Sequence, residues 1–122
     1  MATVTAILAR GDHRTSLNEV FTMHSWSGLG SGDDGLPISY VDYADRTVQV
    51  GGTFSGGTVI IEGSLDGLTY HTLTDPVGND LSYTSADLST VMEAVRYIRP
   101  RISGGDGSTS ITVTMMTRRE VV

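Results

Sequence analysis

Apolar and polar residues alternate with a period of two along most of this chain, and Gly- or Asp-rich turns separate the alternating runs. The clearest runs are residues 47–54, 58–63, 68–73, 95–102 and 110–116. Successive side chains of a β-strand point to opposite faces, so each run predicts a half-buried strand. Short strands joined by regular turns predict an all-β fold, an antiparallel β-sandwich of the jelly-roll or immunoglobulin-like type.

The alternation also predicts which side chains face the core and which face outward. We expect Val95 and Tyr97 on the opposite face of their strand from Ile98 and Ile102. The residues expected to be buried are Val48, Val50, Val59, Ile61, Ile98, Ile102, Ile111 and Val113.

Residues 84–93, TSADLSTVME, break this pattern. Leu88, Val91 and Met92 fall at helical spacing, which predicts one short helical crossover between the sheets. The first 45 residues are also less regular. We interpret the chain as a single domain, with an N-terminal arm of irregular strands in residues 1–45 that contacts a partner, and a β-sandwich core in residues 46–122.

Charge and composition exclude several classes of protein. The 122 residues include 14 acidic side chains and 8 basic ones, and the net charge is −6. An acidic chain without a basic run argues against nucleic acid as a partner. The chain has no cysteine, which excludes disulfides and thiolate zinc sites. No apolar run approaches the roughly 20 residues that span a membrane, and no signal peptide is apparent, so we expect a soluble protein made in the cytoplasm.

Residues with catalytic or metal-binding chemistry do not form a recognisable motif. The three histidines are far apart and lack the spacing of zinc ligands, and the acidic residues of the Gly-rich loops lack the calcium-loop pattern. Turn formation explains those acidic residues. The residues concerned are His13, His24, His71, Asp33, Asp34 and Asp106. We therefore expect no catalytic residue, no metal and no cofactor, and hence not an enzyme.

Two further groups suggest contacts. Arg99 and Arg101 alternate on one strand face, and we expect them to pair with acidic residues on adjacent strands. Phe21, Met23 and Trp26 combine two aromatic residues with methionine, as interface cores do, in an irregular segment. We interpret these three as a candidate partner contact, with core packing as the alternative for each of them.

The chain from Val48 to Arg119 resembles small β-rich proteins of the virion gene clusters of tailed bacteriophages. The matching pieces are VGGTFSGGTVIIEGSLDG, LTDPVGN and AVRYIRPRISGGDGSTSITVTM. The middle of this region also looks like sugar-binding sandwiches of the discoidin kind, which have a similar Ser-x-Asp-Gly hairpin and Arg-Tyr-Ile-Arg strand. Both resemblances lie in strands and turns, so no binding residue is carried over.

The phage resemblance implies a virion structural protein. We favour a capsid decoration (cement) protein on the capsid surface, made in the host cytoplasm, with the major capsid protein and copies of itself as partners, as a trimer or dimer. Another virion part is an alternative, such as a tail, head-completion or fibre-associated protein. A carbohydrate-binding module is a second alternative, but its exposed aromatic cluster is missing, since the five tyrosines are spread along the chain.

Overall fold

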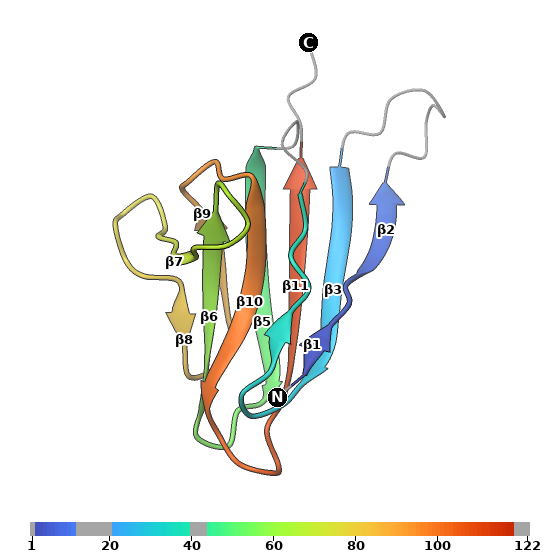
Figure 1. Cartoon of the computed structure of the whole chain (residues 1–122), viewed down its shortest axis with the longest axis vertical. Helices are drawn as coiled ribbons and strands as arrows, with labels where there is room; N and C mark the ends of the chain where they lie inside the picture. Colours follow the sequence, from blue (N-terminus) through green and yellow to red (C-terminus); the bar gives the residue numbers. More distant parts are fainter. Residues whose placement is uncertain (1, 12–20, 40–43, 119–122) are drawn as a thin grey trace.

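The computed structural model describes residues 2–11, 21–39 and 44–118, which form two facing β-sheets (Figure 1). One sheet has the order β1-β4-β10-β6-β7, with β8 also paired to β6, and the other has the order β2-β3-β11-β5-β9. Every pairing is antiparallel except that of β1 with β4. The predicted all-β sandwich is therefore confirmed.

The strands of the six-stranded sheet are β1 (Thr3–Val4), β4 (Asp34–Gly35), β6 (Gly57–Ser64), β7 (His71–Thr72), β8 (Ser82–Tyr83) and β10 (Tyr97–Gly104). Those of the five-stranded sheet are β2 (Ile7–Gly11), β3 (Phe21–Leu29), β5 (Asp45–Thr53), β9 (Asp87–Val91) and β11 (Ser110–Arg118). Within the described ranges we find no helix long and apolar enough to cross a membrane.

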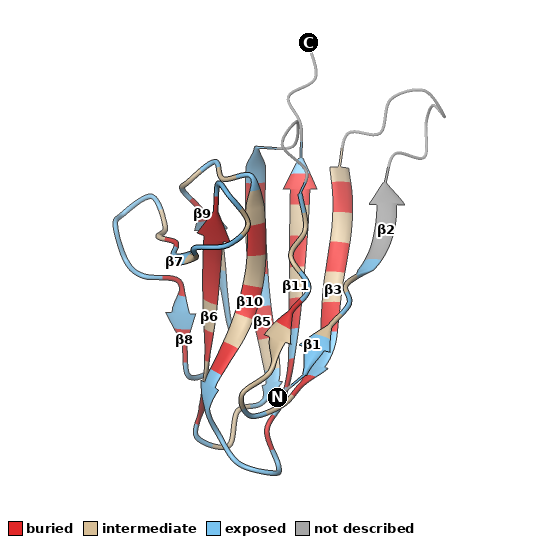
Figure 2. Ribbon diagram, viewed as in Figure 1, coloured by how far each residue is buried: buried red, intermediate tan, exposed pale blue. Residues whose placement is uncertain are grey.

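The core lies between the sheets and is formed by alternate residues of the long strands. Buried positions alternate with half-buried or exposed ones along most of β3, β10 and β11 (Figure 2). All eight residues predicted to be buried are buried. A shift of one residue in any of these strands would move its apolar set to the outer face, so core burial sets the register.

Two connections cross from one sheet to the other, and they lie next to each other at one end of the sandwich. The first connects β5 to β6, and the second connects β10 to β11 (Figure 1). Thr109 donates its hydroxyl hydrogen to the carbonyl of Phe54 at 3.0 Å, and Ser55 donates to the Asp106 carboxylate at 2.7 Å. These bonds tie one crossover to the other.

Trp26 of β3 is a core residue, fully buried between the sheets. Its Nε1–H donates to the carbonyl of Leu36 at 3.1 Å, so its polar atom is satisfied. Gly35 lies directly against the ring: a Cβ at this position would stand 2.8 Å from Trp26 Cδ1 and 2.6 Å from Pro100 Cδ. The close approach requires glycine at position 35.

The interior is polar around the first residues of β3. Thr22, His24, Arg46 and Thr117 are all buried there. Thr22 Oγ1 hydrogen-bonds His24 Nε2 at 2.9 Å and also Thr117 Oγ1, and Arg46 donates to the carbonyl of Val95 at 3.0 Å. Burial lowers the pKa of both His24 and Arg46. This part of the interior is thus held by hydrogen bonds.

The predicted helical crossover in residues 84–93 is wrong, because Asp87–Val91 form strand β9 and pair with β5. Val91 is buried and Leu88 is exposed, because residues three apart in a strand lie on opposite faces. Tyr97 lies on the outer face as predicted. The next residue of the strand, Ile98, is buried in the core, and successive side chains point to opposite faces. Val95 instead packs against the core, because it precedes β10 and does not follow that strand's alternation.

The first 45 residues include strands β1 to β4, and β5 begins at Asp45. Strand β3 lies inside the five-stranded sheet, between β2 and β11. Its residues Trp26 and Leu29 belong to the core. The described part of residues 1–45 is therefore integral to the sandwich and is not a separate arm.

Trp26→Ala should destabilise the fold by about 3–5 kcal/mol, because it leaves a cavity against Gly35 and removes the bond to Leu36. Urea unfolding followed by circular dichroism would measure the change. As a control, Thr112→Ala on the exposed face of β11 should alter stability by less than about 0.5 kcal/mol. An unchanged unfolding midpoint in the tryptophan variant would contradict the core assignment.

Candidate functional site

Two loops beside β7 form the most distinctive surface of the described chain. We call residues 64–70 and 74–80 together the loop pair. The first loop follows β6 and the second leads from β7 to β8, at the left of Figure 1. Each loop contains an aspartate that organises it and apolar residues near its tip.

In the first loop, the carboxylate of Asp66 accepts hydrogen bonds from the surrounding residues. Its Oδ1 accepts N–H bonds from Leu68 at 2.8 Å and Thr69 at 2.9 Å, and a hydroxyl bond from Ser64 at 2.8 Å. Backbone donation by Thr69 and Leu68, with help from Ser64, lowers the pKa of Asp66 to about 2. These hydrogen bonds within the loop hold its conformation.

Gly67 completes this turn. Its N–H donates to Ser64 Oγ at 2.9 Å, and its φ of 78° lies in the left-handed region. A Cβ at this position would stand 3.2 Å from the ring of Tyr97. The Ser64-Leu65-Asp66-Gly67 motif therefore has a structural explanation: it forms a rigid turn that packs on Tyr97.

The second loop is also held by an aspartate that accepts hydrogen bonds from residues of the same loop. Asp75 Oδ1 accepts the N–H groups of Val77 and Asn79, both at 2.9 Å, and Oδ2 accepts Asn79 Nδ2 at 3.2 Å. The Asn79 backbone bond is the largest cause of the lowered pKa of Asp75. The Gly78 N–H closes the turn on the carbonyl of Asp75 at 3.0 Å.

The loop pair presents large apolar side chains to solvent. Leu65 is 70% exposed, and Leu68 and Val77 are each 86% exposed. The loops also contain Asp66, Asp75 and Asp80 and no arginine. In the described part of the chain, no ion pair involves these three carboxylates. The loops thus carry exposed apolar side chains together with three carboxylates, and Arg99 lies over Tyr70 at the end of the first loop.

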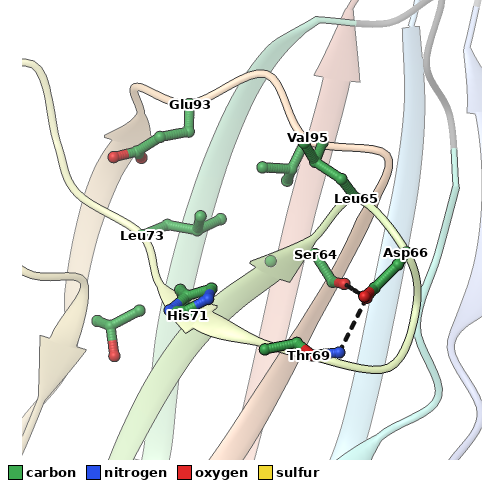
Figure 3. Close-up of a pocket in the computed structure, with 10 residues that line it drawn as sticks. Ser64, Leu65, Asp66, Thr69, His71, Leu73, Glu93 and Val95 are labelled. Atoms are coloured by element: carbon green, nitrogen blue, oxygen red, sulfur yellow. Dashed lines mark hydrogen bonds between the residues drawn. The ribbon is translucent and has the colours of Figure 1, made fainter.

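A pocket of about 400 Å³ lies at the base of the first loop (Figure 3). Leu73 and Val95 give it an apolar wall, and the Glu93 and Asp66 carboxylates lie on opposite sides of it. The residues that line it are Gly63, Ser64, Leu65, Asp66, Thr69, His71, Thr72, Leu73, Glu93 and Val95. Its size and lining suit an aliphatic group.

The polar side chains around this pocket serve as braces. Glu93 accepts the N–H of Thr74 at 2.8 Å and its hydroxyl hydrogen at 2.5 Å. Burial alone would raise the pKa of Glu93, but the bonds from Thr74 lower it overall. Ser64 donates to Asp66 and accepts from Gly67. Within the described ranges, no group of three His, Asp or Glu side chains is gathered as metal ligands would be.

The structure does not bring Phe21, Met23 and Trp26 together. Phe21 and Met23 are half-buried, while Thr22, His24 and Trp26 alternate with them and face the interior. The proposed contact therefore cannot use Trp26, because strand alternation places it in the core. Phe21 and Met23 lie on the outer face of the five-stranded sheet.

Asp33 and Asp106 bond to backbone and side-chain donors in their loops, as the turn interpretation predicts, whereas Asp34 lies in strand β4 and accepts the Thr3 hydroxyl hydrogen at 2.7 Å. Asp33 accepts the N–H groups of Gly30 and Ala2, each at 2.8 Å. Asp106 accepts from Ser55 Oγ at 2.7 Å and from the Ser108 N–H at 2.8 Å. Of the three histidines, His13 lies outside the described residues, His24 is buried and His71 is exposed beside the pocket.

Arg99 and Arg101 pair with an acidic residue on the adjacent strand, which confirms that prediction. Their Nε atoms lie 2.8 Å and 3.2 Å from the two carboxylate oxygens of Glu62 on β6. The Arg99 guanidinium also lies 3.9 Å from the ring centroid of Tyr70, and that of Arg96 lies 5.1 Å from the centroid of Tyr97. Arginines therefore cover a face of each of these two rings.

The sequence pattern did not single out the loop pair as a binding surface. The signal that could have identified it is the presence of large apolar residues next to the Asp and Gly of each turn, since turn residues are usually polar. Leu65, Leu68 and Val77 depart from that rule.

No family model matches the chain, and no curated protein matches its sequence. Among solved structures, it is similar to the SPBc2 prophage-derived protein YomS, with a TM-score of 0.63 and 11% identity over 84% of this chain and 98% of that chain. A recombinant oxalate oxidase in complex with glycolate has a TM-score of 0.50 and 13% identity, over 93% of this chain and 51% of that chain. The chain therefore shares its β-sandwich fold with a prophage-derived protein.

Asp66 should stabilise the protein above about pH 4 and lose this contribution as the pH falls through about 2, because its pKa is lower in the folded loop than in the unfolded chain. Asp66→Asn should therefore reduce stability at pH 6 and bring it closer to the wild-type value near pH 2. Urea midpoints at both pH values would measure the difference. If the variant shows the same deficit at pH 2 as at pH 6, the carboxylate charge is not what braces the loop.

Proposed function

We propose that this chain is a non-enzymatic structural protein of a phage particle, a capsid decoration protein that binds the major capsid lattice through the loop pair. Two similarities support a phage role: the segments that resemble those of virion proteins and the fold shared with the prophage-derived protein YomS. The proposal places the protein on the capsid surface, after synthesis in the host cytoplasm.

The observation that carries the proposal is the exposure of Leu65, Leu68 and Val77 on braced loops. Burying one such side chain against a partner contributes about 1.5–3 kcal/mol. Flexible loops would lose much of this gain in conformational entropy on binding. Loops already held by Asp66 and Asp75 lose less, so they are suited to recognition.

The charge of the loop pair specifies the chemistry of the partner. The two loops carry three carboxylates beside their apolar residues and contain no arginine of their own, although Arg99 of β10 lies over Tyr70 at the end of the first loop. A complementary capsid surface would combine an apolar depression with arginine or lysine residues. The pocket beside Leu73 and Val95 could accept an aliphatic side chain from the same partner. On a repeated lattice, contacts of modest strength act together.

The alternatives use the surface differently. A tail, head-completion or fibre-associated protein could employ the same loops on another virion partner. A carbohydrate-binding module needs free aromatic faces for stacking, but arginines lie over the Tyr70 and Tyr97 rings. The half-buried pair Phe21 and Met23 is a second candidate contact on the outer face of the five-stranded sheet.

The double variant Leu65→Ser, Leu68→Ser should raise the Kd for capsid shells by at least about tenfold, because it removes apolar contact while keeping the loop braces. Shells assembled from the major capsid protein alone would be sedimented with increasing amounts of each protein. Leu36→Ser is a matched control, because Leu36 is partly exposed and lies outside the loop pair. Binding should also weaken with rising salt concentration.

If the double variant binds shells as the wild type does, the loop pair is not the contact. Met23→Ser would then test the second candidate surface. If the wild-type protein binds purified tails but not shells, the decoration role is wrong, while a structural role in the virion is retained.

A further inference from the structure

Strands β2 (Ile7–Gly11) and β9 (Asp87–Val91) are the two outer strands of the five-stranded sheet. Each has five residues. Four successive antiparallel pairings separate them, so they run in the same direction. They lie on opposite sides of the sandwich, β2 at the right and β9 at the left of Figure 1. Within the described residues, each has a strand partner on one side only.

One row of cross-strand neighbours connects these two edges. Ile7 is opposite Ser25, Ser25 is opposite Thr114, Thr114 is opposite Gln49, and Gln49 is opposite Leu88. Directly opposed residues share a face, and the 3.2 Å bond between Ser25 Oγ and Thr114 Oγ1 shows this contact in the middle of the row. The middle of the row is polar, but both of its ends are aliphatic.

Those two ends are exposed: Ile7 is 69% and Leu88 61% accessible to solvent. We propose that β2 of one copy of the chain lies beside β9 of the next copy, so that Ile7 contacts Leu88 and the outer-face row continues from one subunit into the other. The partner for this surface is thus a second copy of the chain, docked head to tail.

The strand directions support this arrangement. Because β2 and β9 run in parallel, a rotation about an axis along the strands brings them together as a parallel pair. Such a contact joins two different surfaces, so repetition closes a ring when the rotation permits.

One feature of β9 limits how the edges join. The N–H of Leu88 already donates to Asp87 Oδ1 at 2.7 Å, so this amide is not offered to a neighbouring strand. A charged residue on an edge strand reduces non-specific pairing with strands of other molecules. Recognition therefore depends on the aliphatic pair Ile7 and Leu88, which makes it testable by substitution.

Two single variants, Ile7→Asp and Leu88→Asp, test the proposal by sedimentation velocity. The wild-type protein should form oligomers, and each variant alone should be monomeric, with its association weakened by at least about tenfold. An equimolar mixture of the two should form 1:1 heterodimers. The Ile7→Asp chain keeps an intact β9 edge, and the Leu88→Asp chain keeps an intact β2 edge.

Other outcomes would overturn this head-to-tail contact. If Leu88→Asp alone still dimerises, β2 pairs with itself, and if Ile7→Asp alone still dimerises, β9 pairs with itself. A wild-type protein that is monomeric at all concentrations tested would refute self-association through these edges. Thr112→Asp adds the same charge to an exposed position of β11 away from both edges and should leave the oligomers intact.

Circular dichroism of every variant would verify that it is folded. Substitutions at exposed positions should preserve the fold. The test is independent of capsid binding. Leu68→Ser should leave self-association unchanged, since residue 68 lies outside the five-stranded sheet. Loss of the heterodimer with retained shell binding would refute the inference alone, and the reverse result would refute the decoration role alone.

Discussion

The structure depends on the burial of alternate residues of the long strands between two sheets. Val48 and Val50 of β5 face Val59 and Ile61 of β6 across this interior, and β10 and β11 contribute their own alternate sets. Because the side-chain period of a strand is two, this burial determines both what is inside and what is displayed outside. The Arg99–Glu62 pair and the row from Ile7 to Leu88 follow from the same register.

The core that stabilises the fold and the proposed contact surface lie in different parts of the molecule. The core residues and the bonds between the two crossovers hold the sandwich together. The loop pair is held instead by side-chain carboxylates within each loop, so its exposed leucines and valine are not needed for folding. Substitutions at Leu65, Leu68 and Val77 can therefore change binding without unfolding the protein, which makes the functional proposal accessible to experiment.

The two proposed surfaces serve different contacts. Rigid acidic loops with apolar tips suit a basic and partly apolar partner, while the edges of the five-stranded sheet suit a second copy of the same chain. A small protein with few contacts to each partner gains strength when copies bind a repeated lattice and one another. Trp26 contributes to neither surface, because it is buried in the core.

The sequence by itself determined the β class, most turns, the eight predicted core residues and the pairing of Arg99 and Arg101 with a neighbouring acid. These features follow from local alternation and turn chemistry. The tertiary structure decided that residues 87–91 form a strand, that Trp26 is internal, and that Val95 joins the core. The helical spacing of Leu88, Val91 and Met92 was a local signal, but β5 supplied backbone partners for a strand. Such partners come from segments distant in the chain, and local patterns do not specify them.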